Sequence, residues 1–142
     1  FSRKGWIDGN AEKGSFQNYV EKLQIKVSGH HQLASQLSGG NQQKVVLAKW
    51  LGRNAEILIF DEPTRGIDVG AKYEIYQWMN QLAKAGKGIV MISSELPEVL
   101  GMSDRILVMK EGELMGELNN DPGLTQETLM ALAIGQKSER AA

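Results

Sequence analysis

The sequence predicts an α/β fold with a mainly parallel sheet flanked by helices. Three short apolar runs, at 57–60, 89–92 and 106–109, have the length and the β-branched content of buried strands. A helical pattern at 69–85 separates the first two runs. Strands that are apolar on both faces need cover on both sides, which is typical of parallel strands connected by helices. The order strand, helix, strand therefore indicates a βαβ unit.

The other predicted elements follow in chain order. Residues 1–36 are polar, and one helix is expected there, from Ser15 to about Leu23. The next helix opens at Gly39 and Gly40, is apolar on several sides, which predicts burial, and stops at 52–54. On the helix at 69–85, Ile75, Met79 and Leu82 share one face. The later elements are a short helix that has Pro97 in its first turn and ends near Gly101, a turn at 110–112 into an edge strand at 113–118, and a last helix between Thr125 and Gly135.

Composition excludes several classes of protein. The chain has 142 residues, 42% of them apolar, which suits a single globular domain. Its 16 basic and 17 acidic residues give a net charge of −1, so we expect no nucleic acid partner. The absence of cysteine excludes disulfides and thiolate metal sites and suits a reducing cytosol. No apolar run approaches the roughly 18 residues of a membrane helix.

Two adjacent acids close the first apolar run, in the stretch ILIFDEPTRGID at 57–68. Ligands bind beyond the carboxyl ends of parallel strands, and side chains alternate in direction there. Asp61 could therefore hold Mg²⁺ while Glu62 orients a nucleophilic water. The alternative is that these acids merely begin a loop.

A second candidate site is the stretch LSGGNQQK at 37–44, which opens a helix. Two glycines leave the first N–H groups of the helix uncovered, so a phosphate can approach them, and Ser38 adds a hydroxyl. The alternative is a serine N-cap with glycines for a tight entry. The basic residues that follow, Lys44, Lys49 and Arg53, are expected to form a solvated face or to complement the dipole at the C-terminal end of the helix.

Together these stretches resemble the nucleotide-binding domain of ABC-type ATPases, with signature, Walker B and D-loop in family order. DEPTRGIDVGAKYEIY and SSELPEVLGMSDRILVM resemble in particular the second half of the ATP-binding subunit of bacterial monosaccharide importers, of the ribose, xylose, arabinose and galactose type. The similarity is strong from Leu37 to about Gly116. It implies a P-loop NTPase fold in which two domains face each other and share each ATP.

The resemblance assigns roles to eight residues. Those of the signature would cap the γ-phosphate of an ATP held by the partner domain: Ser38, Gly39 and Gly40, with Gln42 nearby. Those of the second stretch would act at this domain's own site or across the interface: Asp61 on Mg²⁺, Glu62 as the catalytic residue on the attacking water, and Asp68 as the D-loop carboxylate. Ser94 stands where the family usually has its switch histidine.

The sequence departs from the family pattern in three places. Asn41 replaces a common glutamine, and Ser94 lacks the reach and the titration range of an imidazole. No G-x-x-x-x-G-K-[ST] pattern occurs in the 142 residues, so the main phosphate cradle is missing. We therefore expect the chain to be the C-terminal piece of a longer ATPase domain and to be inactive by itself.

The predicted organisation is a helical-subdomain portion at 1–54, an α/β catalytic portion at 55–135 and a disordered tail at 136–142. The resemblance implies ATP and Mg²⁺ as cofactors in the full subunit. It implies as partners a second ABC ATPase domain, membrane permease subunits and, indirectly, a periplasmic sugar-binding protein. The subunit would be cytoplasmic and peripheral on the inner face of the cell membrane. The alternatives are a soluble ABC ATPase acting on ribosomes or DNA and, for this chain alone, a module for interaction only.

Overall fold

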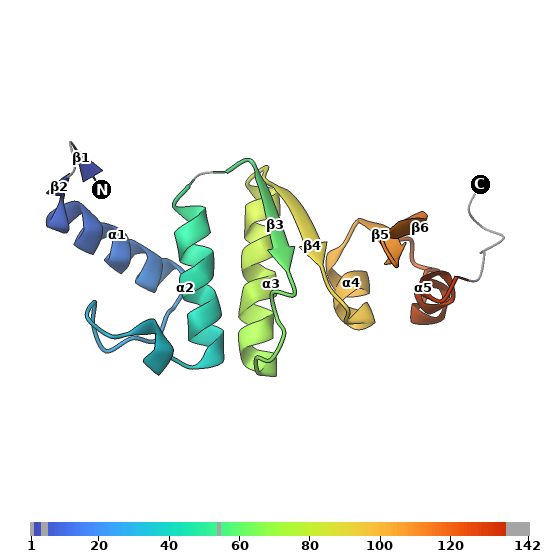
Figure 1. Cartoon of the computed structure of the whole chain (residues 1–142), viewed down its shortest axis with the longest axis horizontal. Coiled ribbons are helices and arrows are strands. Elements are labelled where there is room, and N and C mark those ends of the chain that lie inside the picture. The colour runs from blue at the N-terminus through green and yellow to red at the C-terminus, as the bar shows by residue number, and fades with distance from the viewer. Residues whose placement is uncertain (1, 4–5, 54, 136–142) are drawn as a thin grey trace. The chain divides into compact units, whose positions relative to one another are not determined.

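The computed structural model describes residues 2–3, 6–53 and 55–135. The chain divides into two compact units. The first unit contains Phe1–Leu58 and Pro63–Val90, and the second contains Ile59–Glu62 and Met91–Ala142. The elements of each unit are labelled in Figure 1.

The first unit opens with a short antiparallel pair of strands, β1 (Ser2–Arg3) and β2 (Trp6–Ile7), which the sequence pattern did not predict. Helix α1 (Gly9–Lys22) follows. A helix is confirmed here, but the expected start at Ser15 is wrong. The Asp8 carboxylate accepts hydrogen bonds from the N–H groups of Asn10 and Ala11, at 3.0 and 3.1 Å, and so caps a helix that begins six residues earlier than expected (15 − 9 = 6).

A 3₁₀ turn, η1 (Ala34–Gln36), leads into helix α2 (Gly39–Leu51), which the sequence predicted. The expected burial on several sides is wrong. Gly40, Lys44 and Leu47 are buried, whereas Val46 and Trp50 are 49% and 56% exposed. The helix therefore buries a single face.

Helix α3 (Val69–Lys84) lies beside α2, as Figure 1 shows. On its predicted inner face Ile75 and Met79 are buried and Leu82 is half-buried. Ile75 and Met79 belong to the buried apolar set of the first unit, which comprises Leu23, Ile25, Leu47, Leu58, Ile75 and Met79. The shared core keeps α2 and α3 packed together.

Strands β3 (Ile57–Asp61) and β4 (Gly88–Ile92) form a two-stranded sheet. The Gly88 N–H donates to the Glu56 carbonyl at 2.8 Å, and the Glu62 N–H donates to the Ile92 carbonyl at 2.9 Å. Residue numbers rise together along both strands, so the pair is parallel, with α3 as its connection. The predicted βαβ unit is confirmed. Both strands nevertheless carry exposed apolar side chains, namely Ile57, Ile59, Val90 and Ile92.

In the second unit, β5 (Arg105–Lys110) and β6 (Glu113–Asn119) form an antiparallel hairpin. The predicted turn is confirmed, with Glu111 and Gly112 both at positive φ. Within the described residues β5 pairs only with β6, so the parallel pairing lies in β3 and β4. Helices α4 (Leu96–Met102) and α5 (Gln126–Ala133) complete the unit. Its core contains Ile106, Val108, Leu129 and Leu132.

None of the helices in the part of the chain that the structure describes has the length and apolarity needed to cross a membrane. The tail predicted at 136–142 lies outside the described residues.

Candidate functional site

The diglycine at the start of α2 is required by close packing against α3. A Cβ atom added to Gly40 would lie 2.6 Å from the Cβ of Ala71, which is too close for two carbon atoms. A Cβ added to Gly39 would meet the Ile67 side chain at 3.7 Å, an ordinary contact. Gly40 therefore has no space for a side chain, while Gly39 could carry one. The two glycines have different structural roles.

Ser38 precedes this diglycine as the N-cap residue of α2, but its side chain makes no capping hydrogen bond. Its Oγ instead accepts a 2.8 Å hydrogen bond from the Asn41 side-chain amide. The Gln42 amide turns back to donate to the Leu37 carbonyl at 2.9 Å. At the exposed start of α2, the first N–H groups thus have no side-chain acceptor. The helix dipole favours an anion there.

Asp68, the predicted D-loop carboxylate, lies near the same diglycine. Its Oδ1 accepts the Ala71 N–H at 3.0 Å and caps α3. Its Oδ2 lies 4.0 Å from the position that a Gly40 Cβ would occupy. The structure therefore brings Ser38, the diglycine and Asp68 together at the N-terminal ends of two adjacent helices.

The first turns of α2 are also tied to the segment that follows α1. Asn41 Oδ1 accepts the Lys26 N–H at 2.8 Å, and Lys44 Nζ donates to the Gln24 carbonyl at 3.2 Å. Lys44 also forms an ion pair with Glu74 of α3. Lys44 is only 5% exposed, so its predicted place on a solvated face is wrong. The ammonium group can be buried because the Gln24 carbonyl accepts a hydrogen bond from it and the Glu74 carboxylate forms an ion pair with it.

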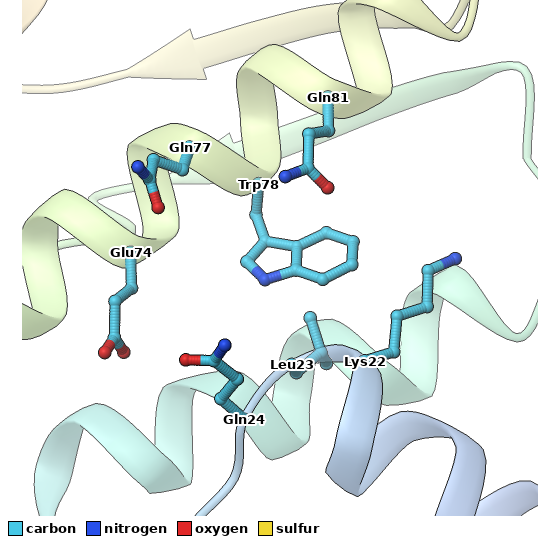
Figure 2. Close-up of a pocket in the computed structure, with 7 residues that line it drawn as sticks. All are labelled: Lys22, Leu23, Gln24, Glu74, Gln77, Trp78 and Gln81. Atoms are coloured by element: carbon cyan, nitrogen blue, oxygen red, sulfur yellow. The ribbon is translucent and has the colours of Figure 1, made fainter.

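A small cavity lies beside this ion pair. It has a volume of about 230 Å³ and is lined by the end of α1 and by one face of α3. Figure 2 shows Leu23 and Gln24 facing Trp78 of α3, with Glu74 at one side and Lys22 at the other. The Lys22 ammonium lies 5.5 Å from the centre of the Trp78 ring, at the distance of a cation–π contact. None of the predicted site residues lines this cavity.

The paired acids stand at the end of β3 in the second unit. Asp61 is exposed, and Glu62 is half-buried with a positive φ of 45°. The Glu62 N–H continues the parallel ladder, while its Oε1 accepts the backbone N–H of Ser94 at 3.0 Å. The structure thus joins the predicted catalytic carboxylate to the predicted switch position. The contact uses the backbone of Ser94 and not its hydroxyl.

The loop that carries Ser94 is itself held by its neighbours. Ser93 Oγ hydrogen bonds to the buried carboxylate of Glu98 and accepts the Glu95 N–H at 3.1 Å. The sequence analysis assigned no role to Ser93 or Glu98. The signal was present as a serine followed by an acid five residues later, across the start of a helix.

Comparisons with known proteins agree on one family. Residues 3–65 match the family described as "ABC transporter". Ribose import ATP-binding protein RbsA of Bacillus licheniformis is 57% identical over 135 residues, which cover 95% of this chain and 27% of that protein. The protein of the same name from Bacillus subtilis is 53% identical over 135 residues, again 95% and 27%.

Over almost its whole length this chain is similar to ABC transporter ATP-binding proteins. Two solved structures of the cassette MJ0796 support the fold of an ABC ATPase. The dimeric bacterial ABC transporter cassette has a TM-score of 0.70 and 25% identity, covering 84% of this chain and 51% of that chain. The dimeric post-hydrolysis state bound to ADP and Pi has a TM-score of 0.71 and 24% identity, with the same coverage. The predicted resemblance to ABC ATPases and the predicted fold class are confirmed.

This chain spans about a quarter, 27%, of the length of these ribose import relatives. Within the described residues no group of three or more His, Cys, Asp or Glu side chains could hold a metal ion.

Proposed function

We propose that this chain is part of an ATP-binding subunit that couples ATP binding and hydrolysis to the import of a monosaccharide. The observation that carries the proposal is the exposed start of α2, where Ser38 leaves the helix without a side-chain cap. An unsatisfied helix start of this kind favours a phosphate group. The named relatives are ribose import ATP-binding proteins, which supports ribose or a similar sugar as the transported substrate.

The start of α2 would act on a nucleotide held by a second ATPase domain. Ser38, Gly39 and Gly40 would offer a hydroxyl and backbone N–H groups to its terminal phosphate, with Gln42 nearby. The contact between Gly40 and α3 supports this role, because it holds the helix start in one position beside Asp68. Asp68 caps α3 and would relay a change at the domain interface to the start of that helix.

The end of β3 would serve the nucleotide of this domain's own site. Asp61 is exposed, and a single carboxylate suits Mg²⁺, which keeps several water ligands. The ion would neutralise phosphate charge. Glu62 would orient the attacking water and take its proton, and the Ser94 N–H would hold the carboxylate in place. The P-loop that binds most of the nucleotide would come from a part of the subunit outside the sequence described here.

The partners of such a subunit would be a second ABC ATPase domain and membrane permease subunits. A periplasmic sugar-binding protein would deliver the sugar to the permease. The subunit would lie at the inner face of the cell membrane. A soluble ABC ATPase that acts on ribosomes or DNA is the second candidate, but the near-neutral charge and the names of the relatives favour import.

The proposal is tested in the complete transporter in liposomes by introducing Ser38→Arg into the Glu62→Gln variant. In Glu62→Gln the remaining ATP turnover comes from the opposite site, which Ser38 serves. Adding Ser38→Arg to this variant should lower the remaining turnover by about 100-fold, because a bulky cation would fill the anion site. Sugar uptake should fall with it.

The matched control is Ser35→Arg, which places the same charge on the exposed η1 turn, three residues before Ser38. Its turnover should equal that of the parent. Equal turnover of the Ser38→Arg protein and the control would remove the role proposed for the start of α2.

A further inference from the structure

Asn41 makes two side-chain hydrogen bonds in the first turn of α2. Its Oδ1 accepts the Lys26 backbone N–H at 2.8 Å, and its Nδ2 donates to Ser38 Oγ at 2.8 Å. A backbone N–H can only donate, so the atom that faces Lys26 must be the amide oxygen. The atom that faces Ser38 is then the amide nitrogen. The direction of the bond between Asn41 and Ser38 is therefore determined: the serine hydroxyl accepts.

This direction decides what the hydroxyl of Ser38 can do next. A serine hydroxyl has one hydrogen to donate and two lone pairs that accept. Asn41 occupies one lone pair, and Ser38 makes no capping bond to α2. The hydroxyl hydrogen thus remains available to an anion at the exposed helix start. An acceptor at position 41 would instead take this hydrogen for itself.

The amide of Asn41 is held in its orientation by a rigid neighbour. Lys26 follows two buried residues, Leu23 and Ile25, and the Gln24 carbonyl is bound by Lys44. Asn41 and Lys44 lie three residues apart on one face of α2, so they fasten this segment at two points. A flip of the Asn41 amide would set its NH₂ group against the Lys26 N–H. The segment therefore selects a single orientation.

We propose that Asn41 is a positioning residue that reserves the hydroxyl hydrogen of Ser38 for a terminal phosphoryl oxygen. This inference rests on the function proposed above for Ser38. It adds that the segment after α1 acts on the phosphate site through Asn41. Asn41 itself does not touch the nucleotide.

The test is a double-mutant cycle in the complete transporter, with ATP turnover measured over a range of ATP concentrations. Asn41→Asp keeps the shape of the side chain and the oxygen that accepts the Lys26 N–H. Its carboxylate only accepts, however, so the Ser38 hydroxyl would donate its hydrogen to this carboxylate and not to the phosphate. Turnover should fall by about tenfold, the size expected for a lost hydrogen bond to a charged group. In a Ser38→Ala background the same substitution should have little further effect, because no hydroxyl remains to be oriented. Gln43→Glu adds the same charge to α2 at a residue outside the proposed site and should match the parent.

Amide hydrogen exchange at Lys26 gives a readout that does not depend on activity. Asn41→Asp should keep this amide protected, whereas Asn41→Ala should expose it to exchange. A purely structural role predicts that alanine lowers turnover at least as much as aspartate. Our proposal predicts the reverse order, since alanine leaves the Ser38 hydroxyl free to rotate toward the phosphate.

The outcomes separate the inference from the proposed function. If Ser38→Ala retains the turnover of the parent, the role proposed for Ser38 is wrong and the inference falls with it. If Ser38→Ala lowers turnover but Asn41→Asp lowers it equally in both backgrounds, the inference alone is overturned. Should the aspartate protein not fold, Asn41→Ala carries the same cycle. A partial loss that is smaller than the loss in Ser38→Ala and is seen only when Ser38 is present supports the proposal, because the hydroxyl is then free but no longer oriented. No loss, or an equal loss in both backgrounds, overturns it.

Discussion

The carboxylate Oε1 of Glu62 accepts a 3.0 Å hydrogen bond from the backbone N–H of Ser94. The resemblance predicts that position 94 corresponds to the histidine that ABC ATPases usually carry, and the contact found here needs no particular side chain. Ser93, Glu95 and Glu98 hold the loop through hydrogen bonds of their own. The carboxylate of Glu62 is therefore oriented even though the imidazole is absent.

This relationship predicts different results for two substitutions of Ser94. Ser94→Pro removes the N–H and should lower ATP turnover by roughly tenfold, as expected for a lost hydrogen bond to a charged group. Ser94→Ala keeps the N–H and should have a clearly smaller effect. Turnover at saturating ATP in the complete transporter measures the difference. Equal losses in the two variants would show that the backbone contact does not matter.

The contact between Gly40 and Ala71 predicts that α2 tolerates no side chain at position 40. Gly40→Ala places two Cβ atoms 2.6 Å apart and should destabilise the protein by about 1–3 kcal/mol, the usual cost of overpacking. Gly39→Ala, with its ordinary contact, should cost much less. Chemical denaturation measures both. Adding Ala71→Gly should restore part of the stability of Gly40→Ala, and no recovery would show that the strain lies elsewhere.

Because the Lys44 ammonium is buried, we expect the loss of its two contacts to lower the free energy of unfolding by different amounts. Lys44→Met leaves the Gln24 carbonyl without its donor and should cost about 1–3 kcal/mol. Glu74→Gln should cost less, because the Glu74 side chain is 42% exposed and water can replace the ion pair. The matched control is Lys49→Met, an exposed lysine of the same helix, which should change stability by less than about 0.5 kcal/mol. A cost for Lys44→Met no larger than that of this control would contradict the role of the buried charge.

The N-terminus of α5 predicts a local pH dependence. A hydrogen bond from the Thr125 side chain lowers the pKa of Glu127 below its ordinary value of 4.5. A hydrogen bond from the backbone N–H of Glu127 itself lowers this pKa further, by a smaller amount. A lowered pKa in the folded state means that the stabilising effect is present above the pKa of the unfolded chain and is lost as the pH falls through the folded value. Thr125→Ala should raise the pKa of Glu127 toward 4.5 and remove the cap to the Thr128 N–H. Carboxyl chemical shifts followed by NMR during acid titration measure the change, and an unaltered titration would show that Thr125 does not hold Glu127.

Local patterns in the sequence were enough to predict most elements. The apolar runs at 57–60 and 89–92 and the helix between them specify a parallel pair, because backbone pairing follows from the alternation of strand and helix. The start of α1 was missed because the Asp8 cap lies before a weakly periodic stretch. The predicted roles of Ser38, Asp61, Glu62 and Asp68 came from their motifs, and they stay predictions until tested.

Only the tertiary structure could show which residues support the site. Asn41 contacts a residue 15 positions away, Lys44 one 20 positions away, and Glu62 one 32 positions away. The periodicity of one helix or strand contains no information on such partners, so Lys44 was placed on a solvated face and Asn41 was taken as a small departure. The sequence by itself determined the order of the elements and the chemistry offered at their ends, because these depend on neighbours along the chain. Packing of α2 between α3 and the segment after α1 decided which charge is buried and which way the Ser38 hydroxyl can donate, because a buried polar group must find its partner wherever the fold places one.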